Sequence, residues 1–172
     1  MNIEELKKEL FLLNNEQQMI FALIMFNRAY PEYIKFSLNS NWGDANKLSN
    51  LVYIDNISSN EVKIANLLQV SPDGDTFGDV QACMARDVCA IVYDIICFTA
   101  TKEITHIIEI QKNSLNIVYL YILSHNDLKI YANLNEIMQE KAMLDEIEQQ
   151  YIIIQDIKTE QVKEKYKSII LS

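Results

Sequence analysis

The stretch from Asp79 to Phe98 (DVQACMARDVCAIVYDIICF) repeats apolar residues every three or four positions, the spacing that aligns one face of an α-helix. The positions on that face are Val80, Met84, Val88, Ile91, Ile95 and Phe98. The opposite face is apolar too, with Ala85, Cys89, Val92 and Ile96. Since a helix that is apolar nearly all round is normally enclosed by others, we expect residues 79–98 to form the central helix of a bundle.

The same periodicity predicts further helices on either side of this one. Apolar positions at helical spacing run through residues 3–13, 19–36, 48–52, 62–68, 104–122, 137–154 and 162–169. Pro31 falls inside the second segment. We expect a kink or a fresh start there, because the proline ring removes an amide donor and disfavours helical geometry at the preceding residue.

Caps and turn formers mark where these helices begin and end. Asn14 or Asn15 can cap the second helix, and Asn133 with Glu136 resembles a capping box before one long helix over residues 137–154. Gly43 suits a left-handed residue that ends a helix, and Asp44 suits the cap that begins the next. The segment SPDGDTFG, residues 71–78, is the one stretch rich in turn formers, and it predicts an exposed acidic loop.

Composition agrees with an all-α fold. The 172 residues include only three Gly and two Pro, too few for the many turns of a sandwich or barrel. The length suits one domain with its own core. We therefore expect residues 1–172 to form a single-domain helical bundle of about seven to eight helices around the buried helix at 79–98.

The sequence shows neither the pattern of a targeting signal nor closely spaced cysteine pairs. No apolar run approaches the roughly 18 residues of a membrane span, and the charged start MNIEELKKEL lacks the apolar core of a signal peptide. Cys83, Cys89 and Cys97 lie six and eight residues apart, without the short pairs typical of zinc ligands. We expect a cytoplasmic protein with reduced cysteines and no cofactor or metal.

The net charge of −9 is unevenly placed. Residues 51–110 hold nine acids and three bases, and so supply six of the nine excess negative charges. Such a surface repels nucleic acid and anionic membranes but attracts a basic protein. The candidate contacts for that protein are Asp55, Glu61, Asp73, Asp75, Asp79 and Glu103. The acidity also has a simpler explanation, which is that it keeps the protein soluble.

Two sets of side chains are candidates for catalytic or metal-binding groups. Glu103, His106 and Glu109 share a helical face, and Glu-x-x-His is one half of a carboxylate-bridged di-metal site, but no second motif accompanies it. Asp87 and Asp94 lie two helical turns apart without a nucleophile, a partner base or a phosphate loop. We therefore expect that the protein is not an enzyme. A metal-dependent enzyme built on His106, Glu109 and Asp87 is a third hypothesis, after the two given at the end of this section.

Three blocks resemble the YjaG-like family, a bacterial domain of unknown function. They are FALIMFNRAYPEYIKFSLNSNWGDANKL, ARDVCAIVYDII and THIIEIQKNSLNIV, within residues 15–125. The matching positions are Arg28, Tyr30, Pro31, Tyr33, Phe36, Gly43, Asp44, Asp87, Cys89, His106, Glu109, Lys112 and Ser114. The resemblance implies a compact all-α bundle and no particular activity.

Composition suggests a function more specific than that resemblance. Lysine outnumbers arginine 13 to 2, as in the AT-rich genes frequent in mobile bacterial islands. Our leading hypothesis is an immunity protein that covers the basic active site of a nuclease toxin, an RNase of a contact-dependent growth inhibition type system. The alternative is a housekeeping helical protein of the YjaG-like family with an unknown ligand, for which a homodimer is one arrangement.

Overall fold

The computed structural model describes residues 2–53, 58–125 and 134–159, and within these it contains eight α-helices and no strand. The helices are α1 (Ile3–Phe11), α2 (Asn15–Ser40), α3 (Ala45–Tyr53), α4 (Asn60–Leu68), α5 (Val80–Thr101), α6 (Ile104–His125), α7 (Leu134–Met138) and α8 (Lys141–Lys158). The predicted all-α class is confirmed.

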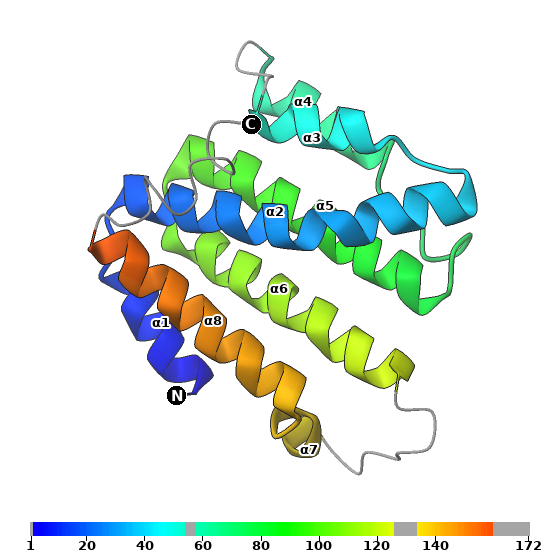
Figure 1. Ribbon diagram of the computed structural model, residues 1–172. Helices are drawn as coiled ribbons and strands as arrows, with labels where there is room; N and C mark the ends of the chain where they lie inside the picture. Colours follow the sequence, from blue (N-terminus) through cyan, green and yellow to red (C-terminus); the bar gives the residue numbers. More distant parts are fainter. Residues whose placement is uncertain (1, 54–57, 126–133, 160–172) are drawn as a thin grey trace.

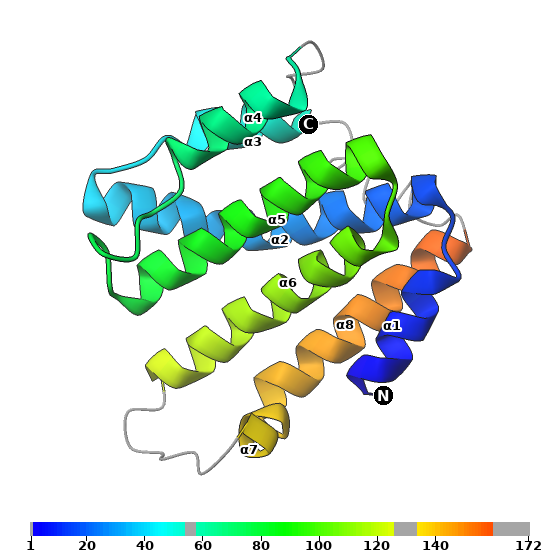
Figure 2. The same cartoon turned by 180° about the vertical axis from the view of Figure 1, so that it is seen from behind.

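Helix α5 lies at the centre of the arrangement, as its sequence predicts. It contacts α2, α3, α4 and α6, and its most extensive contact is with α6. Figure 1 shows α2, α5 and α6 in the middle, with α3 and α4 on one side and α1 and α8 on the other; the view from behind in Figure 2 gives the same order. Both predicted apolar faces of α5 are buried, except that Val80 in its first turn is 36% exposed.

The second helix starts where the sequence predicts. Asn14 Oδ1 accepts a hydrogen bond from Gln17 N at 3.0 Å, and Gln17 Oε1 accepts one from Asn14 N at 3.0 Å. These reciprocal bonds form a capping box that satisfies two of the amides left unpaired at a helix start. The prediction that Asn14 can cap this helix is therefore confirmed.

The predicted fresh start at Pro31 is wrong, because α2 continues through it to Ser40. A proline inside a helix costs about 3 kcal/mol. On either side of it, buried residues fix the helix: Ala29 is 6% exposed, and Tyr33 and Phe36 are almost fully buried. Tertiary packing on both sides of Pro31 therefore outweighs the local penalty, and the ring itself lies on the exposed side.

The corner between α2 and α3 uses two left-handed residues instead of one. Asn41 (φ 51°) ends α2, and Gly43 (φ 83°) follows two positions later. Asp44 then accepts a hydrogen bond from Lys47 N at 2.9 Å and so caps α3, as its sequence position suggests. A side chain at Gly43 would start 2.6 Å from the Tyr33 hydroxyl, which explains why glycine is required there.

The long helix expected over residues 137–154 is divided into α7 and α8, so that prediction is wrong. The amides of Gln139 and Glu140 bond to Glu136 and Ile137 carbonyls, which closes α7 with a tight turn. Glu140 itself is extended (ψ 140°) and begins α8. The apolar period continues across this break without Gly or Pro, so the sequence carries no signal for it. The proposed Asn133 cap and the last predicted helix (162–169) lie outside the described residues.

Two simpler expectations can also be compared with the structure. Within the described ranges, no helix is both long enough and apolar enough to cross a bilayer. All three cysteines are free thiols; Cys89 is buried beside the Val70 carbonyl, and burial raises the pKa of its thiol to about 12. Cys89 is therefore a core residue and not a reactive thiol.

Candidate functional site

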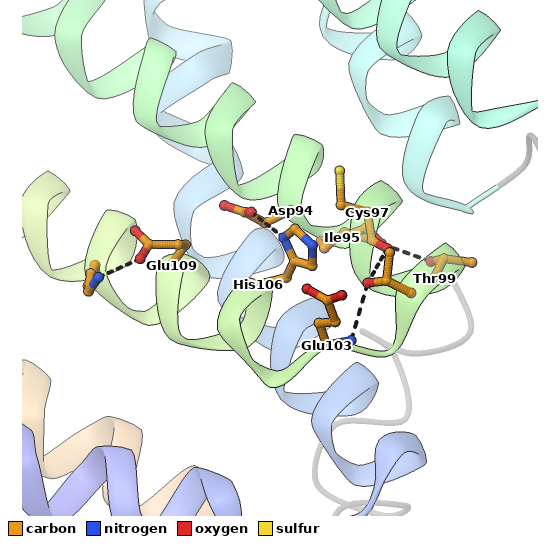
Figure 3. Close-up of polar contacts among 9 residues, drawn as sticks. Asp94, Ile95, Cys97, Thr99, Glu103, His106 and Glu109 are labelled. Atoms are coloured by element: carbon orange, nitrogen blue, oxygen red, sulfur yellow. Dashed lines mark hydrogen bonds and ion pairs between the residues drawn. The ribbon is translucent and has the colours of Figure 1, made fainter.

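Two polar side-chain pairs cross the contact between α5 and α6. His106 Nδ1 lies 2.9 Å from Asp94 Oδ1, and Asn116 Nδ2 donates to Asp87 Oδ2 at 2.6 Å. In Figure 3, Asp94 on α5 and His106 on α6 point toward one another. Their side chains are 10% and 21% exposed, so the pair is largely shielded from solvent.

Burial controls the electrostatics of both carboxylates. Loss of solvation raises the pKa of Asp94, and the hydrogen bond with His106 opposes that rise. Loss of solvation raises the pKa of Asp87 too, and the amide of Asn116 opposes it. Each buried carboxylate is therefore matched by a donor on the facing helix, as buried polar groups generally are.

The turn between α5 and α6 sets this pairing. Lys102 ends α5 in a left-handed conformation (φ 58°), and the chain reverses so that the helices run antiparallel. Thr101 Oγ1 donates to the Cys97 carbonyl at 3.1 Å and accepts from Glu103 N at 3.2 Å. An antiparallel pair brings together residues at similar distances from the turn. Asp94 thus meets His106 near the turn, and Asp87 meets Asn116 two to three helical turns further out.

The proposed metal trio of His106, Glu109 and Asp87 does not come together. His106 pairs with Asp94, whereas Glu109 forms an ion pair with Lys112 on its own helix. Figure 3 shows the Glu109 carboxylate turned away from the imidazole. Among the described residues, no group of three or more His, Cys, Asp and Glu side chains could hold a metal ion.

The geometry around His106 can orient an imidazole but supplies nothing for it to act on. A carboxylate on one ring nitrogen is how enzymes orient a general base. None of the cavities described below is lined by His106 or Asp94. The pair is best understood as a polar connection that holds α6 in one register against α5.

A second site lies at the other end of α5, where the loop of residues 71–79 enters that helix. Asp73 Oδ1 and Oδ2 accept bonds from Asp75 N and Thr76 Oγ1, both at 3.1 Å. Asp79 Oδ1 accepts from Ala82 N at 2.7 Å and so caps α5. We call residues 71–79 the acidic loop: it has three exposed carboxylates and no lysine or arginine, and local hydrogen bonds position two of them.

Three aromatic rings pack together beside the acidic loop. Phe77 meets Phe36 edge-on with ring centroids 5.3 Å apart, and it lies 5.2 Å from the ring of Trp42. Phe36 is buried, but Trp42 and Phe77 keep part of their surface in solvent. Arg86 of α5 is the nearby cation, with Nη1 2.8 Å from where a side chain at Gly74 would begin. This end of the bundle therefore combines rigid aromatic surface with an acidic rim.

The six predicted partner contacts do not form one patch. Asp73, Asp75 and Asp79 share the acidic loop, and Asp55 lies outside the described residues. Glu61 is in the first turn of α4, one whole helix before the loop.

The expectation that Glu103 joins the same surface is wrong. Asp79 precedes α5 and Glu103 follows it, so the 22 residues of that helix separate them by about 33 Å. Charge counted along the chain could not show this, because the middle third of the sequence spans the full length of the molecule.

Two features of the site were not found from the sequence. The pairing of Asp94 with His106 could have been found by placing the turn at Lys102 first. The bidentate pair of Arg28 with Glu146 could not: its nitrogens lie 3.1 and 2.5 Å from the carboxylate oxygens, but the two residues are 118 positions apart. No local spacing reports such a contact.

The fold and site together define an all-α helical bundle with a polar α5–α6 contact and an acidic loop at one end. A family model described as "Protein of unknown function (DUF416)" matches residues 5–170. The chain therefore belongs to the DUF416 family.

A solved structure supports the fold. The chain is similar to a DUF416 family protein from Shewanella baltica OS155, whose crystal structure was determined at 1.91 Å resolution, with a TM-score of 0.80 and 23% sequence identity. The likeness covers 95% of this chain and 92% of the other, so the whole bundle is shared. A search of the curated proteins gives no match to this chain.

Proposed function

We propose that the protein is a binding module that docks a cationic protein against the acidic loop. The more specific form of the proposal is an immunity protein, acting in the cytoplasm, that covers the basic active site of a nuclease toxin such as an RNase of a contact-dependent growth inhibition type system. The observation that supports it is the three exposed carboxylates of the loop beside the half-buried rings of Trp42 and Phe77.

The physical argument combines charge with preorganisation. A nuclease presents positive charge to the phosphate backbone, so an acidic inhibitor is steered to the same cleft and competes with the substrate. The hydrogen bonds that hold Asp73 and Asp79 reduce the ordering needed on binding. Aromatic side chains such as Trp42 are frequent anchors at the centre of protein interfaces. Glu103 is no longer among the proposed contacts.

The immunity function predicts that a basic nuclease domain is encoded beside this gene, and the test is a binding titration with that domain in purified form. The variant D73N/D75N/D79N removes three charges. The single oxygen of asparagine can still accept from Asp75 N at position 73 and from Ala82 N at position 79, and the NH2 group at position 73 can donate to Thr76 Oγ1 in place of the bond that Asp73 Oδ2 accepts. We expect it to weaken binding by about a hundredfold, and we expect wild-type affinity to fall as salt rises from 0.05 to 0.5 M, on the order of tenfold or more.

The matched control is E103Q/D145N/E148Q, which removes three exposed charges away from the acidic loop. We expect its affinity to stay within about threefold of wild type. Equal losses in both triple variants would refute the acidic loop as the docking site, and absence of a complex at low salt would refute the immunity function. If the protein self-associates in sedimentation and forms no complex with the nuclease, the result would favour the alternative, a housekeeping homodimer. The YjaG-like assignment is part of that alternative.

A further inference from the structure

Two adjoining cavities lie on the side of the bundle away from α3 and α4, among α1, α6, α7 and α8. The first has a volume of about 230 Å³ and the second about 390 Å³. Ile3 and Met138 line both of them, so the two cavities are neighbours, and we call them together the hollow. Figure 1 shows α1, α7 and α8 on the same side of α6.

The walls of this hollow are mainly apolar. The first cavity is lined by Ile3, Lys7, Lys112, Leu115, Asn116, Tyr119, Met138 and Met143. The second is lined by Asn2, Ile3, Glu4, Met138, Gln139, Leu144 and Ile147, so its one carboxylate, Glu4, lies away from the first cavity's lining. A hollow of this size and lining is typical of small-molecule sites, in which apolar walls accompany a few polar groups. The two methionines are flexible enough to fit a ligand of variable shape.

Two lysines from different helices meet at the first cavity. Lys7 of α1 and Lys112 of α6 line it, and no acidic residue does. Each lysine has an acid three positions earlier on its own helix, Glu4 for Lys7 and Glu109 for Lys112. Such exposed pairs are worth little, so a ligand anion can take their place. In a chain with only 15 lysines and arginines against 24 acids, two cations beside an apolar hollow make a distinctive anion-binding feature.

We propose that this hollow binds the carboxylate of an unbranched, medium-chain fatty acid. The alkyl chain occupies the apolar cavity, and the carboxylate lies between the ammonium groups of Lys7 and Lys112. Asn116 also lines the cavity, but its amide already donates to Asp87, so the lysines are the groups that select the anion. This site is independent of the acidic loop, and its test does not depend on the proposed function.

The experiment follows methionine methyl signals by NMR while decanoate is added to the full-length protein. The chain has six methionines, so their labelled methyl groups give a simple spectrum. We expect Met138 and Met143 to shift and Met84, buried on α5, to stay unchanged. Affinity should rise about threefold to fourfold for each methylene from hexanoate through octanoate to decanoate.

The head group is tested with decanol and with lysine variants. We expect decanol and K7Q/K112Q with decanoate each to bind about fivefold to tenfold more weakly than wild type with decanoate. The control is K8Q/K35Q. Lys8 is an exposed lysine of α1, and Lys35 pairs with an acid three residues earlier, as Lys7 and Lys112 do. We expect this variant to bind decanoate as wild type does.

Three results would overturn the proposal. They are no shift of Met138 and Met143 at millimolar decanoate, equal affinity for decanol, and equal losses in the two lysine variants. The first result would show that decanoate does not bind in the hollow. Either of the other two would show that the two lysines do not select the carboxylate.

Discussion

At the scale of single residues, polar side chains of α5 connect that helix to α6. Asp87 and Asp94 lie on one face of α5, and each takes a hydrogen-bond donor from α6. Both have pKa values raised by burial. Shifted carboxyl groups are frequent at active sites, but structural polar pairs shift them as well. Here the hydrogen bond of Asp94 to His106 on the facing helix accounts for the structural role.

Asp87 gives a pH prediction with a definite sign. Because its folded pKa is raised, its contribution to stability is complete below the unfolded value near 3.9 and is lost as pH rises through the folded pKa. In D87N, the side-chain oxygen can still accept the hydrogen bond from Asn116 Nδ2, but the group no longer ionises, so stability is not lost in this way as the pH rises. We therefore expect the free energy of unfolding of D87N, measured in urea, to improve relative to wild type between pH 3 and pH 7.

The control for D87N is D145N, which removes one negative charge from an exposed position of α8. We expect the gain of D87N over this range to exceed that of D145N. A D87N variant that loses stability relative to wild type as the pH rises would contradict the assignment of Asp87 as a desolvated carboxyl.

At the scale of elements, one buried tyrosine ties three segments together. Tyr33 on α2 is fully buried, and its hydroxyl donates to the Val70 carbonyl at 2.6 Å. The same hydroxyl accepts from Asp44 N at 3.3 Å, at the start of α3. Helix α2, the α2–α3 corner and the segment after α4 therefore meet at one oxygen atom, on a residue two positions after Pro31.

Y33F removes this hydroxyl without changing the ring. We expect it to lower the free energy of unfolding by about 1–3 kcal/mol, since the buried Val70 carbonyl loses its short hydrogen bond. Urea titration followed by far-UV circular dichroism measures the change. Y121F, at a side chain that is 49% exposed, is the control and should stay within about 0.5 kcal/mol of wild type. A loss no larger than that control would show that the hydroxyl does not tie these segments.

At the scale of the whole molecule, the core is continuous from α1 to α8. Leu6 and Leu10 of α1 are fully buried, and α1 packs against α8 and α6. Glu9 of α1 bonds to Lys158 and Gln155 near the end of α8. The first and last described helices are thus joined to one another and, through α6, to α5. A single cooperative unit is the natural expectation, and the prediction of one domain over residues 1–172 can be tested as such.

The one tryptophan makes that test simple. Trp42 lies between α2 and α3, on the side of the bundle away from α1 and α8, and it reports only its own surroundings. We expect urea unfolding followed by Trp42 fluorescence and by far-UV circular dichroism to give coincident midpoints and slopes, as for a two-state domain. Two separated transitions would show that the chain contains more than one folding unit.

The sequence predicted those parts of the fold that depend on local chemistry. The period of apolar residues in α5, the Asn14 cap and the Asp44 cap all involve neighbours within a few positions, and all three are present in the structure. Pro31 misled the local argument because buried residues on both sides keep α2 continuous. The break at Gln139 and Glu140 left no mark, because the apolar period runs through it.

What the sequence alone determined is the helical class, the central place of α5 and the excess of acid in the middle of the chain. Only the tertiary structure decided which charges meet: it grouped Asp73, Asp75 and Asp79, placed Glu103 at the far end of α5, and brought Lys7 and Lys112 to one cavity. The reason is physical. Helix periodicity is set by neighbours along the chain, whereas a binding surface is set by how whole helices pack. Asp79 and Glu103 belong to the same acidic third of the sequence, but the 22 residues of α5 separate them.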